Sequence, residues 1–415
     1  MVTITSYSVA ILLTVVTMLC WGSWGNTQKL ATKTWPFQLF YWDFTFGILI
    51  LSLILGLTMG STGSGGRSFI PDLYQASLHG GSLQRLTRLE GSHGATFSKA
   101  GSYFLDRFSS LQQPPLLQLC GRDGRVMRRL GESATSALRR VALGKVEIFK
   151  IPTGDGLQLP AVWVLPPDFK MEKRYPVVFS IYGGPGSRSV SDAFPRRLDD
   201  YFLAQQGIIV LKVDHRGAGH FGKQGTEAMH RCLGKWEIAD YCSAASYMRT
   251  LPFVDGNKIG ITGGSYGGYV AALALAAAPD SFACGIADFA VSDWSLYDSV
   301  YTERYMDLPT ENPEGYRQAS VLSHLQTYRG GLRLTHGSMD DNVHMQNTLQ
   351  LLNGLLDLGK TTELMVYPGE RHGIRGIKAV EYYRSALDFW KRKFFFQPDR
   401  IPVVSVELVD PKKKR

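Results

Sequence analysis

The sequence predicts an α/β fold, a mostly parallel sheet covered by helices on both faces, over residues 141–397. Short apolar runs flanked by helical stretches predict the strands, at residues 177–181, 208–213, 258–262, 284–289, 332–335 and 364–367. Strands buried on both faces form continuous apolar runs, whereas half-buried strands alternate. One domain of this architecture accounts for the whole segment.

Two apolar stretches near the start of the chain, residues 7–25 and 37–59, predict a two-helix transmembrane hairpin. A helix of about 20 apolar residues crosses a hydrocarbon layer of about 30 Å. A signal peptide is the alternative for the first stretch, but it lacks a basic leading segment and a small-residue cleavage site, and a second apolar run follows it. We therefore expect a membrane protein with two spans. The few basic residues near the spans leave open which side holds the rest of the chain.

The residues between the hairpin and the α/β domain predict a linker and then a small β segment. Glycine, serine and proline dominate residues 61–72. Strand-like runs separated by turn residues follow at 73–78, 96–98, 102–106 and 114–120. They predict one sheet of about four strands, the size of a single β-propeller blade. The predicted domains are thus 1–66, the hairpin; 73–140, the β segment; 141–397, the α/β domain; and 398–415, a basic tail.

Charge and cysteine usage exclude several functions. The net charge of +9 comes partly from basic residues in the stretch 122–140 and at 412–415. No aromatic platform or nucleic-acid motif accompanies them, so a solvated surface is favoured over a nucleic-acid partner. The five cysteines form no CxxC pair and no metal-like spacing with histidine. We expect neither a metal nor another cofactor.

Ser265 is the predicted nucleophile of a serine hydrolase. It lies in Gly263-Gly264-Ser265-Tyr266-Gly267, after the run 258–262 and before the helical stretch 269–278. A strand, a sharp glycine-flanked turn and a helix are the context that a nucleophile elbow requires. The helix that follows directs its N-terminal dipole at developing negative charge. A glycine-rich turn with a passive serine is the alternative, and the placement of the motif disfavours it.

The acid and the base of the predicted triad follow the serine in sequence. In this fold the order is serine, acid, histidine. Asp340 and His372 lie on loops just beyond the runs 332–335 and 364–367, at the sheet edge where α/β proteins bind ligands. We interpret His372 as the general base and then acid, and Asp340 as the carboxylate that orients it. A helix N-cap is the alternative for Asp340, Asp341 competes with it, and the rival bases are His215, His220, His336 and His344.

An oxyanion hole requires hydrogen-bond donors near the nucleophile. The backbone N–H of Tyr266, directly after the serine, supplies one. Tyr182 ends the run 177–181 and precedes Gly183-Gly184-Pro185, so its phenol is a candidate for the second. The pattern alone supports a core tyrosine at a strand end equally well.

These motifs together resemble the prolyl oligopeptidase family, specifically its dipeptidyl-peptidase IV branch. The resemblance covers roughly residues 73–396 and rests on separated motifs in the same order: Tyr182-Gly183-Gly184-Pro185, Asp214-His215-Arg216-Gly217, Gly264-Ser265-Tyr266-Gly267-Gly268-Tyr269, residues 294–306, residues 336–344 and His372-Gly373-Ile374. It implies an α/β-hydrolase domain with the triad and oxyanion hole named above. It also implies an S1 pocket sized for proline or alanine and lined by Tyr266, Val291, Trp294, Tyr297, Tyr301 and Val343. The side-chain amide of Asn342 would bind a substrate carbonyl.

The sequence also departs from that family. Members carry a full propeller of seven or eight blades, with an acidic pair that binds the substrate's amino terminus. Here about one blade is predicted, and the chain contains no Glu-Glu pair. Residues 1–70, with Met18-Leu19-Cys20-Trp21-Gly22 and Phe40-Tyr41-Trp42-Asp43, instead resemble the start of a sugar or drug/metabolite-type permease. This indicates a permease-like start fused to a peptidase near residues 66–73.

The predicted function is a membrane-anchored serine peptidase that hydrolyses peptide bonds after proline or alanine through an acyl-enzyme. The alternative is a fusion fragment without the propeller that is inactive or of broad specificity. A transporter subunit is disfavoured, because two helices cannot enclose a midplane site. A peptide substrate and the membrane are the expected partners. Members of the family dimerise, and the sequence leaves open whether this chain does.

Overall fold

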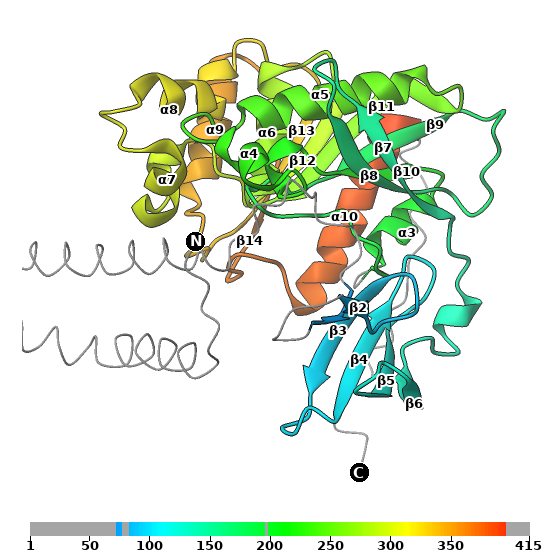
Figure 1. The fold of residues 1–415 in the computed structure, drawn as a ribbon. Helices are drawn as coiled ribbons and strands as arrows, with labels where there is room; N and C mark the ends of the chain where they lie inside the picture. The colour runs from blue at the N-terminus through cyan, green and yellow to red at the C-terminus, as the bar shows by residue number, and fades with distance from the viewer. Residues whose placement is uncertain (1–71, 77–82, 196–197, 396–415) are drawn as a thin grey trace, which may run out of the picture. The chain divides into compact units, whose positions relative to one another are not determined.

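The computed structural model describes residues 72–76, 83–195 and 198–395 (Figure 1). The chain separates into two compact units, Met1–Gly65 and Gly66–Arg415. The predicted hairpin at 7–25 and 37–59, the permease-like start and the basic tail all lie outside the described residues. Within the described ranges, no helix has both the length and the apolar character needed to cross a bilayer.

An eight-stranded mixed sheet forms the centre of the α/β domain. Its strand order is β14-β13-β12-β11-β9-β10-β8-β7, and all neighbours from β14 to β10 are parallel. The antiparallel strands β7 and β8 extend one side of the sheet. The strands are β7 (Val146–Pro152), β8 (Gln158–Val164), β9 (Tyr175–Ser180), β10 (Ile209–Val213), β11 (Val254–Gly264), β12 (Cys284–Asp288), β13 (Gly331–Gly337) and β14 (Glu363–Tyr367).

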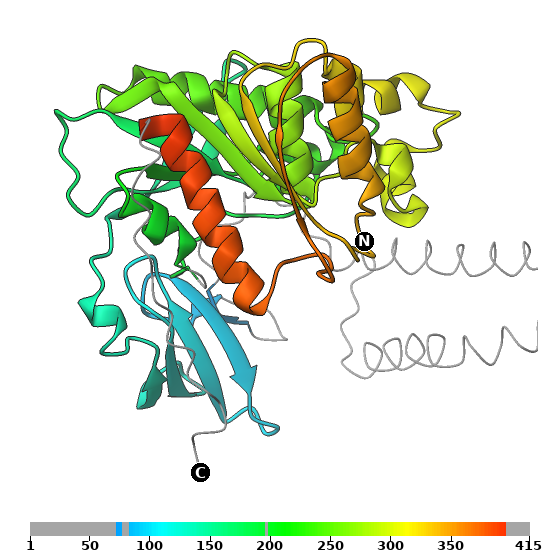
Figure 2. The same cartoon turned by 180° about the vertical axis from the view of Figure 1, so that it is seen from behind.

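Helices cover both faces of this sheet (Figures 1 and 2). The α helices are α3 (Asp199–Ala204), α4 (Gly222–Glu227), α5 (Lys235–Thr250), α6 (Tyr266–Ala277), α7 (Ser299–Met306), α8 (Pro313–Ala319), α9 (Gln346–Asp357) and α10 (Gly376–Phe395). Val177 and Phe179 of β9 join the core that contains α5 and α6. Val178 joins Phe389 and Trp390 of α10 instead. Because successive strand residues face opposite sides, α10 lies across the sheet from α5 and α6.

The sequence-predicted strands of the parallel region are confirmed, since each apolar run coincides with a strand from β9 to β14. The elbow helix is confirmed as α6, which begins at Tyr266. Two differences have physical causes. Strands β7 and β8 were not among the predicted runs: β7 mixes polar with apolar residues, and β8, although apolar from Leu159 to Val164, contains Pro160, which disfavours a strand assignment. The predicted run 284–289 ends as a strand at Asp288, because Phe289 has a φ of +42°.

A second sheet of four antiparallel strands precedes the α/β domain in the chain. It consists of β3 (Ser92–Phe97), β4 (Tyr103–Ser109), β5 (Leu116–Gly121) and β6 (Val126–Glu132), in that order. A separate two-stranded ribbon pairs β1 (Tyr74–Gln75) with β2 (Gln84–Arg85). Hydrogen bonds from Ser92 Oγ to Asp192 O and from Leu111 N to Asp192 Oδ1 connect the sheet to the α/β domain. The predicted runs 96–98, 102–106 and 114–120 lie in this sheet, whereas the run that begins at residue 73 contributes β1 to the separate ribbon and the unpredicted β6 is the fourth strand. The relation of the sheet to a propeller blade and the predicted domain limits stay predictions.

Candidate active site

Ser265 occupies a strained turn between β11 and α6. Its φ of +60° and ψ of −119° fall in a backbone region that non-glycine residues seldom adopt. The flanking glycines make this turn feasible: a Cβ on Gly263 or on Gly267 would lie 2.6 Å from the carbonyl oxygen of Ile181. The Ser265 N–H donates to Asp288 O at 2.8 Å, which fixes the turn against β12. This is the geometry of a nucleophile elbow.

Asp340 and His372 meet beyond the ends of β13 and β14, as the sequence predicts. His372 Nδ1 lies 2.8 Å from Asp340 Oδ2, while Asp340 Oδ1 accepts the N–H groups of Asn342 and Val343, each at 3.0 Å. The Asp340 side chain is fully buried and that of His372 is 22% exposed. A carboxylate held by two amides keeps its remaining oxygen directed at the imidazole, which fixes the ring and its tautomer.

The loops of the acid and the base are joined directly. Met339 N donates to Glu370 O at 2.9 Å, and Ser338 N donates to Tyr367 O at 3.1 Å. A side chain at Gly337 would come within 2.4 Å of the carbonyl oxygens of Glu370 and Arg371. The absence of a Cβ at residue 337 therefore allows the two loops to pack closely enough for the carboxylate to reach the imidazole.

The rival residues have contacts of their own, and one of them, His336, also lies near the acid, with its Nε2 3.4 Å from Asp340 Oδ2. His336 is fully buried, and its ring nitrogens lie 2.8 Å from Val343 O and from Thr348 Oγ1. Burial lowers the pKa of His336 and lowers that of His215 to about 4. His220 lies 2.7 Å from Asp214 Oδ2. Asp341 is exposed and pairs with Arg371 at 2.6 Å. His344 is exposed, and its Nδ1 accepts the N–H of Gln346.

Ser265 follows β11 and His372 follows β14, with β12 and β13 between these strands in the sheet, and no hydrogen bond joins the two side chains in the described residues. Within the described ranges, the structure contains no hydrogen bond made by Ser265 Oγ. In enzymes without bound substrate, the donor–acceptor distances of catalytic hydrogen bonds are often longer than in the substrate complex. The contact between Ser265 and His372 therefore stays a prediction, while the pairing of His372 with Asp340 is part of the geometry.

Tyr182 lies beside the elbow, in the loop that follows β9. Its ring centroid is 6.2 Å from that of Tyr266, and its side chain is 40% exposed. Desolvation raises the pKa of the Tyr182 phenol above its ordinary value, so the hydroxyl stays protonated and able to donate near neutral pH. A Cβ on Gly184 would meet the Tyr182 ring at 2.6 Å, so the glycine makes room for this ring. These features favour the oxyanion interpretation over a core tyrosine.

We expect Tyr182→Phe to lower kcat by about 10²-fold with little change in KM, because one oxyanion donor is lost and the ring is kept. Steady-state kinetics of the two purified proteins test this. Thermal unfolding should be nearly the same for both, since the phenol is partly exposed. An unchanged kcat would exclude the phenol from the oxyanion hole.

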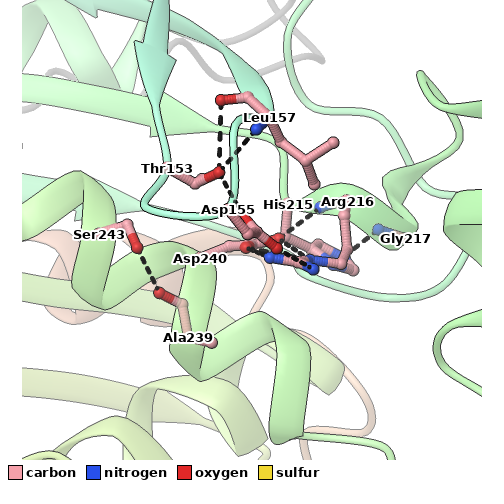
Figure 3. Close-up of polar contacts among 9 residues, drawn as sticks. All are labelled: Thr153, Asp155, Leu157, His215, Arg216, Gly217, Ala239, Asp240 and Ser243. Atoms are coloured by element: carbon pink, nitrogen blue, oxygen red, sulfur yellow. Dashed lines mark hydrogen bonds and ion pairs between the residues drawn. The ribbon is translucent and has the colours of Figure 1, made fainter.

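The Asp214-His215-Arg216-Gly217 motif supports the loop of Tyr182. Figure 3 shows Arg216 between Asp155 and Asp240, with distances of 2.8 Å and 2.6 Å to their carboxylates. Gly217 O then accepts the N–H of Gly186, four residues after Tyr182. The motif therefore has a structural role: a buried ion pair fixes the loop on which the candidate oxyanion donor depends.

Aromatic side chains from separate segments form an apolar cluster next to the elbow. The ring centroid of Trp294 lies 5.3 Å from that of Tyr266, 5.8 Å from that of Tyr297 and 6.0 Å from that of Tyr301. Val291 and Val343 are buried in the same core. Asn342 Oδ1 accepts the Tyr297 hydroxyl at 2.7 Å. The structure thus brings Tyr266, Trp294, Tyr297, Tyr301 and Asn342 together and places Val291 and Val343 in the same large core.

Glu237 lies beneath this cluster, and nothing in the sequence indicated that it would contact the site. Glu237 lies in the first turn of α5 and is fully buried; its Oε1 accepts the Tyr266 hydroxyl at 2.6 Å and the Gly234 N–H at 3.0 Å. Burial raises its pKa to about 7, and the hydrogen bond from Tyr266 partly opposes that shift. A glutamate near a helix start gives no sign of such burial, because it also suits an exposed first turn.

Stability should depend on pH through Glu237. Its pKa is about 7 in the folded chain against an ordinary 4.5, so the folded state binds the proton more tightly. The free energy of unfolding therefore falls as pH rises from about 4.5 to about 7. Glu237→Gln keeps an acceptor for Tyr266 and cannot ionise, so its Tm should fall less between about pH 5 and pH 8. Equal losses in both proteins would assign the pH dependence to other groups.

A cavity of about 760 Å³ borders the candidate site on the α10 side of the sheet. His372, Phe289 and Gly264 line it together with residues of α3 and α10. Its volume lies in the range of ligand pockets. His372 thus has the Asp340 loop on one side and open space on another.

Comparison with known proteins shows that this part of the chain is similar to a known family. Residues 196–396 match the model described as "Prolyl oligopeptidase family". That segment is therefore similar to the prolyl oligopeptidase family. Within this matched segment lie Ser265, Asp340 and His372, whereas Tyr182 precedes it.

Individual relatives of the matched segment agree. Prolyl endopeptidase FAP of Homo sapiens is 37% identical over 262 residues, which cover 62% of this chain and 34% of the relative. Dipeptidyl peptidase 4 of Sus scrofa is 39% identical over 238 residues, covering 57% and 31%. The crystal structure of Porphyromonas gingivalis dipeptidyl peptidase 4 matches with a TM-score of 0.74 and 32% identity, covering 78% of this chain and 46% of that one. The chain therefore spans about a third of the length of these curated relatives.

Proposed function

We propose that the chain is a serine peptidase that hydrolyses peptide bonds after proline or alanine. The observation that carries this proposal is the buried Asp340 carboxylate, which lies 2.8 Å from His372 at the same sheet edge as the strained turn of Ser265. The family match of residues 196–396 supports the same reaction class. No step needs a metal or another cofactor, because serine, imidazole and carboxylate supply nucleophile, base and orientation.

In the proposed reaction Ser265 Oγ attacks the scissile carbonyl carbon while His372 accepts the serine proton. Negative charge then forms on the carbonyl oxygen, where the Tyr266 N–H and the Tyr182 hydroxyl are the proposed donors. The N–H of Tyr266 belongs to the first turn of α6 and has no partner within the helix. His372 protonates the leaving amine, and water hydrolyses the acyl-enzyme by the same proton transfers in reverse.

The substrate preference follows from the aromatic cluster. Trp294, Tyr297 and Tyr301 lie at centroid distances of 5.6 to 6.0 Å from one another, next to Tyr266 of the elbow. A proline ring loses little conformational entropy when it packs between such rings. Asn342, on the Asp340 loop, is the proposed donor to a substrate carbonyl. Release of dipeptides, the activity in the name dipeptidyl peptidase 4, is not part of this proposal, because the chain covers 31% of that relative.

A series of chromogenic dipeptide nitroanilides tests this function. We expect kcat/KM for Gly-Pro and for Gly-Ala to exceed that for Gly-Leu and Gly-Phe by about 10-fold or more, since a pocket that fits a small rigid residue rejects a larger one by a few kcal/mol. His372→Ala should abolish all four activities. Equal turnover of all substrates favours the broad-specificity alternative, and no turnover of any favours the inactive fragment.

We also propose that the chain is held at a membrane through residues 7–25 and 37–59. The support is their apolar composition and length, and these residues lie outside the described ranges. Retention of the protein in the membrane pellet after an alkaline wash tests the proposal. Release into the supernatant would contradict it.

A further inference from the structure

Phe289 follows β12 with a backbone that a bulky residue seldom adopts. Its φ is +42°, although it is not a glycine. Such a conformation is energetically unfavourable and persists only where the surroundings impose it. Phe289 was predicted to be the last residue of a strand, and no catalytic or binding role was predicted for it. Glycine would occupy this position without strain, so the phenylalanine side chain itself requires an explanation.

The backbone at Phe289 is fixed from three directions. Its N–H donates to Thr335 O at 2.8 Å, and the preceding Asp288 O accepts the Ser265 N–H at 2.8 Å. The buried Asp288 carboxylate accepts the hydroxyl groups of Thr335 and of Tyr382 on α10. The dipeptide Asp288-Phe289 is thus bonded to the elbow, to β13 and to α10, which together hold the strained residue in place.

The Phe289 ring lies between the elbow and the base. A Cβ on Gly264, the residue before Ser265, would come 3.2 Å from the Phe289 ring. The ring centroid is 5.4 Å from that of His372, at an interplanar angle of 59°, and 6.4 Å from that of His336. His372 is otherwise held by its hydrogen bond to Asp340 and borders the 760 Å³ cavity. Without the ring, space would open beside the imidazole.

We propose that Phe289 is a positioning residue for His372: its ring packs against the imidazole and keeps the base turned toward Ser265. One hydrogen bond at Nδ1 fixes the position of that nitrogen but leaves the ring free to swing about it. Contact with the Phe289 ring removes that freedom. This inference rests on the proposed peptidase function, and it assigns the strained backbone at residue 289 to that task.

Substitutions at Phe289 test the role. Phe289→Ala should lower kcat by about 10²-fold with KM within about twofold, because a misdirected base slows the chemical step without removing a substrate contact. Phe289→Leu, which keeps most of the apolar volume, should recover most of that loss. Phe289→Gly removes the strain together with the ring, so it should unfold at a higher temperature than Phe289→Ala while its kcat stays equally low. Labelling by a fluorophosphonate should slow in parallel with kcat.

Phe282→Leu is the matched control, because Phe282 is a buried phenylalanine that packs on Phe179 in the core and lies outside the site. Its kcat should equal that of the wild type. A folded Phe289→Ala protein with wild-type kcat, or a leucine variant no better than alanine, would overturn the positioning role. If the alanine variant does not fold, the leucine variant decides: a kcat about 3- to 10-fold below wild type supports the role, and an unchanged kcat refutes it. Failure of the wild type to react with the fluorophosphonate contradicts the proposed function itself.

Discussion

Replacing Ser265 with alanine is expected to abolish covalent labelling by a fluorophosphonate and to lower kcat by about 10⁶-fold. The reagent reacts with a serine only where a neighbouring base activates it, and the strained elbow with the Asp340–His372 pair is the arrangement that does so. Fluorescence of the labelled band on a denaturing gel measures the first effect, and hydrolysis of Gly-Pro nitroanilide measures the second.

The control for this experiment is Ser295→Ala, which removes an exposed serine that bonds to Asp293. Its labelling and turnover should match those of the wild type. Circular dichroism of both variants distinguishes loss of the nucleophile from loss of fold, because the Ser265 side chain makes no hydrogen bond within the described residues. Equal labelling of the wild type and Ser265→Ala would contradict the assignment of Ser265 as the nucleophile.

Replacing Asp340 with asparagine is expected to lower kcat by about 10⁴-fold and leave the fold intact. Asparagine can still accept the N–H groups of Asn342 and Val343 through its amide oxygen. Its amino group would then face His372 Nδ1 in place of a carboxylate oxygen. That contact favours the tautomer in which Nε2 carries the proton, and such an imidazole cannot accept the proton of Ser265. Steady-state kinetics measure the loss.

Asp341→Asn is the matched control for Asp340→Asn. The two residues are adjacent, but Asp341 is exposed and pairs only with Arg371 in the described chain. Removing an exposed ion pair changes stability by about 1 kcal/mol or less. Turnover of Asp341→Asn should therefore stay near that of the wild type. Comparable losses in both variants would mean that the loop as a whole, and not the buried carboxylate, supports the reaction.

The parallel half of the fold, the strained turn at Ser265 and the pairing of Asp340 with His372 were predictable because they depend on local sequence. Strands buried on both faces must be apolar throughout, and the elbow must have glycines beside Ser265. The choice between Asp340 and Asp341, and between His372 and His336, was harder, since each pair satisfies the same pattern. Burial and hydrogen bonding separate them in the structure.

What could not be predicted depends on residues distant in sequence. Glu237 is buried because α5 packs under the elbow, and Phe289 contacts His372 across 83 positions of the chain. The pattern of apolar residues around Glu237 or Phe289 does not indicate such contacts between distant parts of the chain. Strand β6 was missed for another reason: all seven of its residues are exposed, so it has no apolar face to recognise.

Strand β6 also has a consequence for how copies of this chain behave together. In the described part of the chain it pairs only with β5, so its outer side offers backbone N–H and C=O groups to any extended segment. Arg128 and Arg129 lie on this strand, within the basic stretch that contributes to the net charge of +9. Identical strands that approach each other bring these charges together, so repulsion opposes chain-to-chain ladders. At about 1 M salt the screening length falls to about 3 Å. At low salt, the charges that a nucleic-acid interpretation would have assigned to ligand binding therefore oppose pairing between copies of β6, and concentrated salt weakens that repulsion.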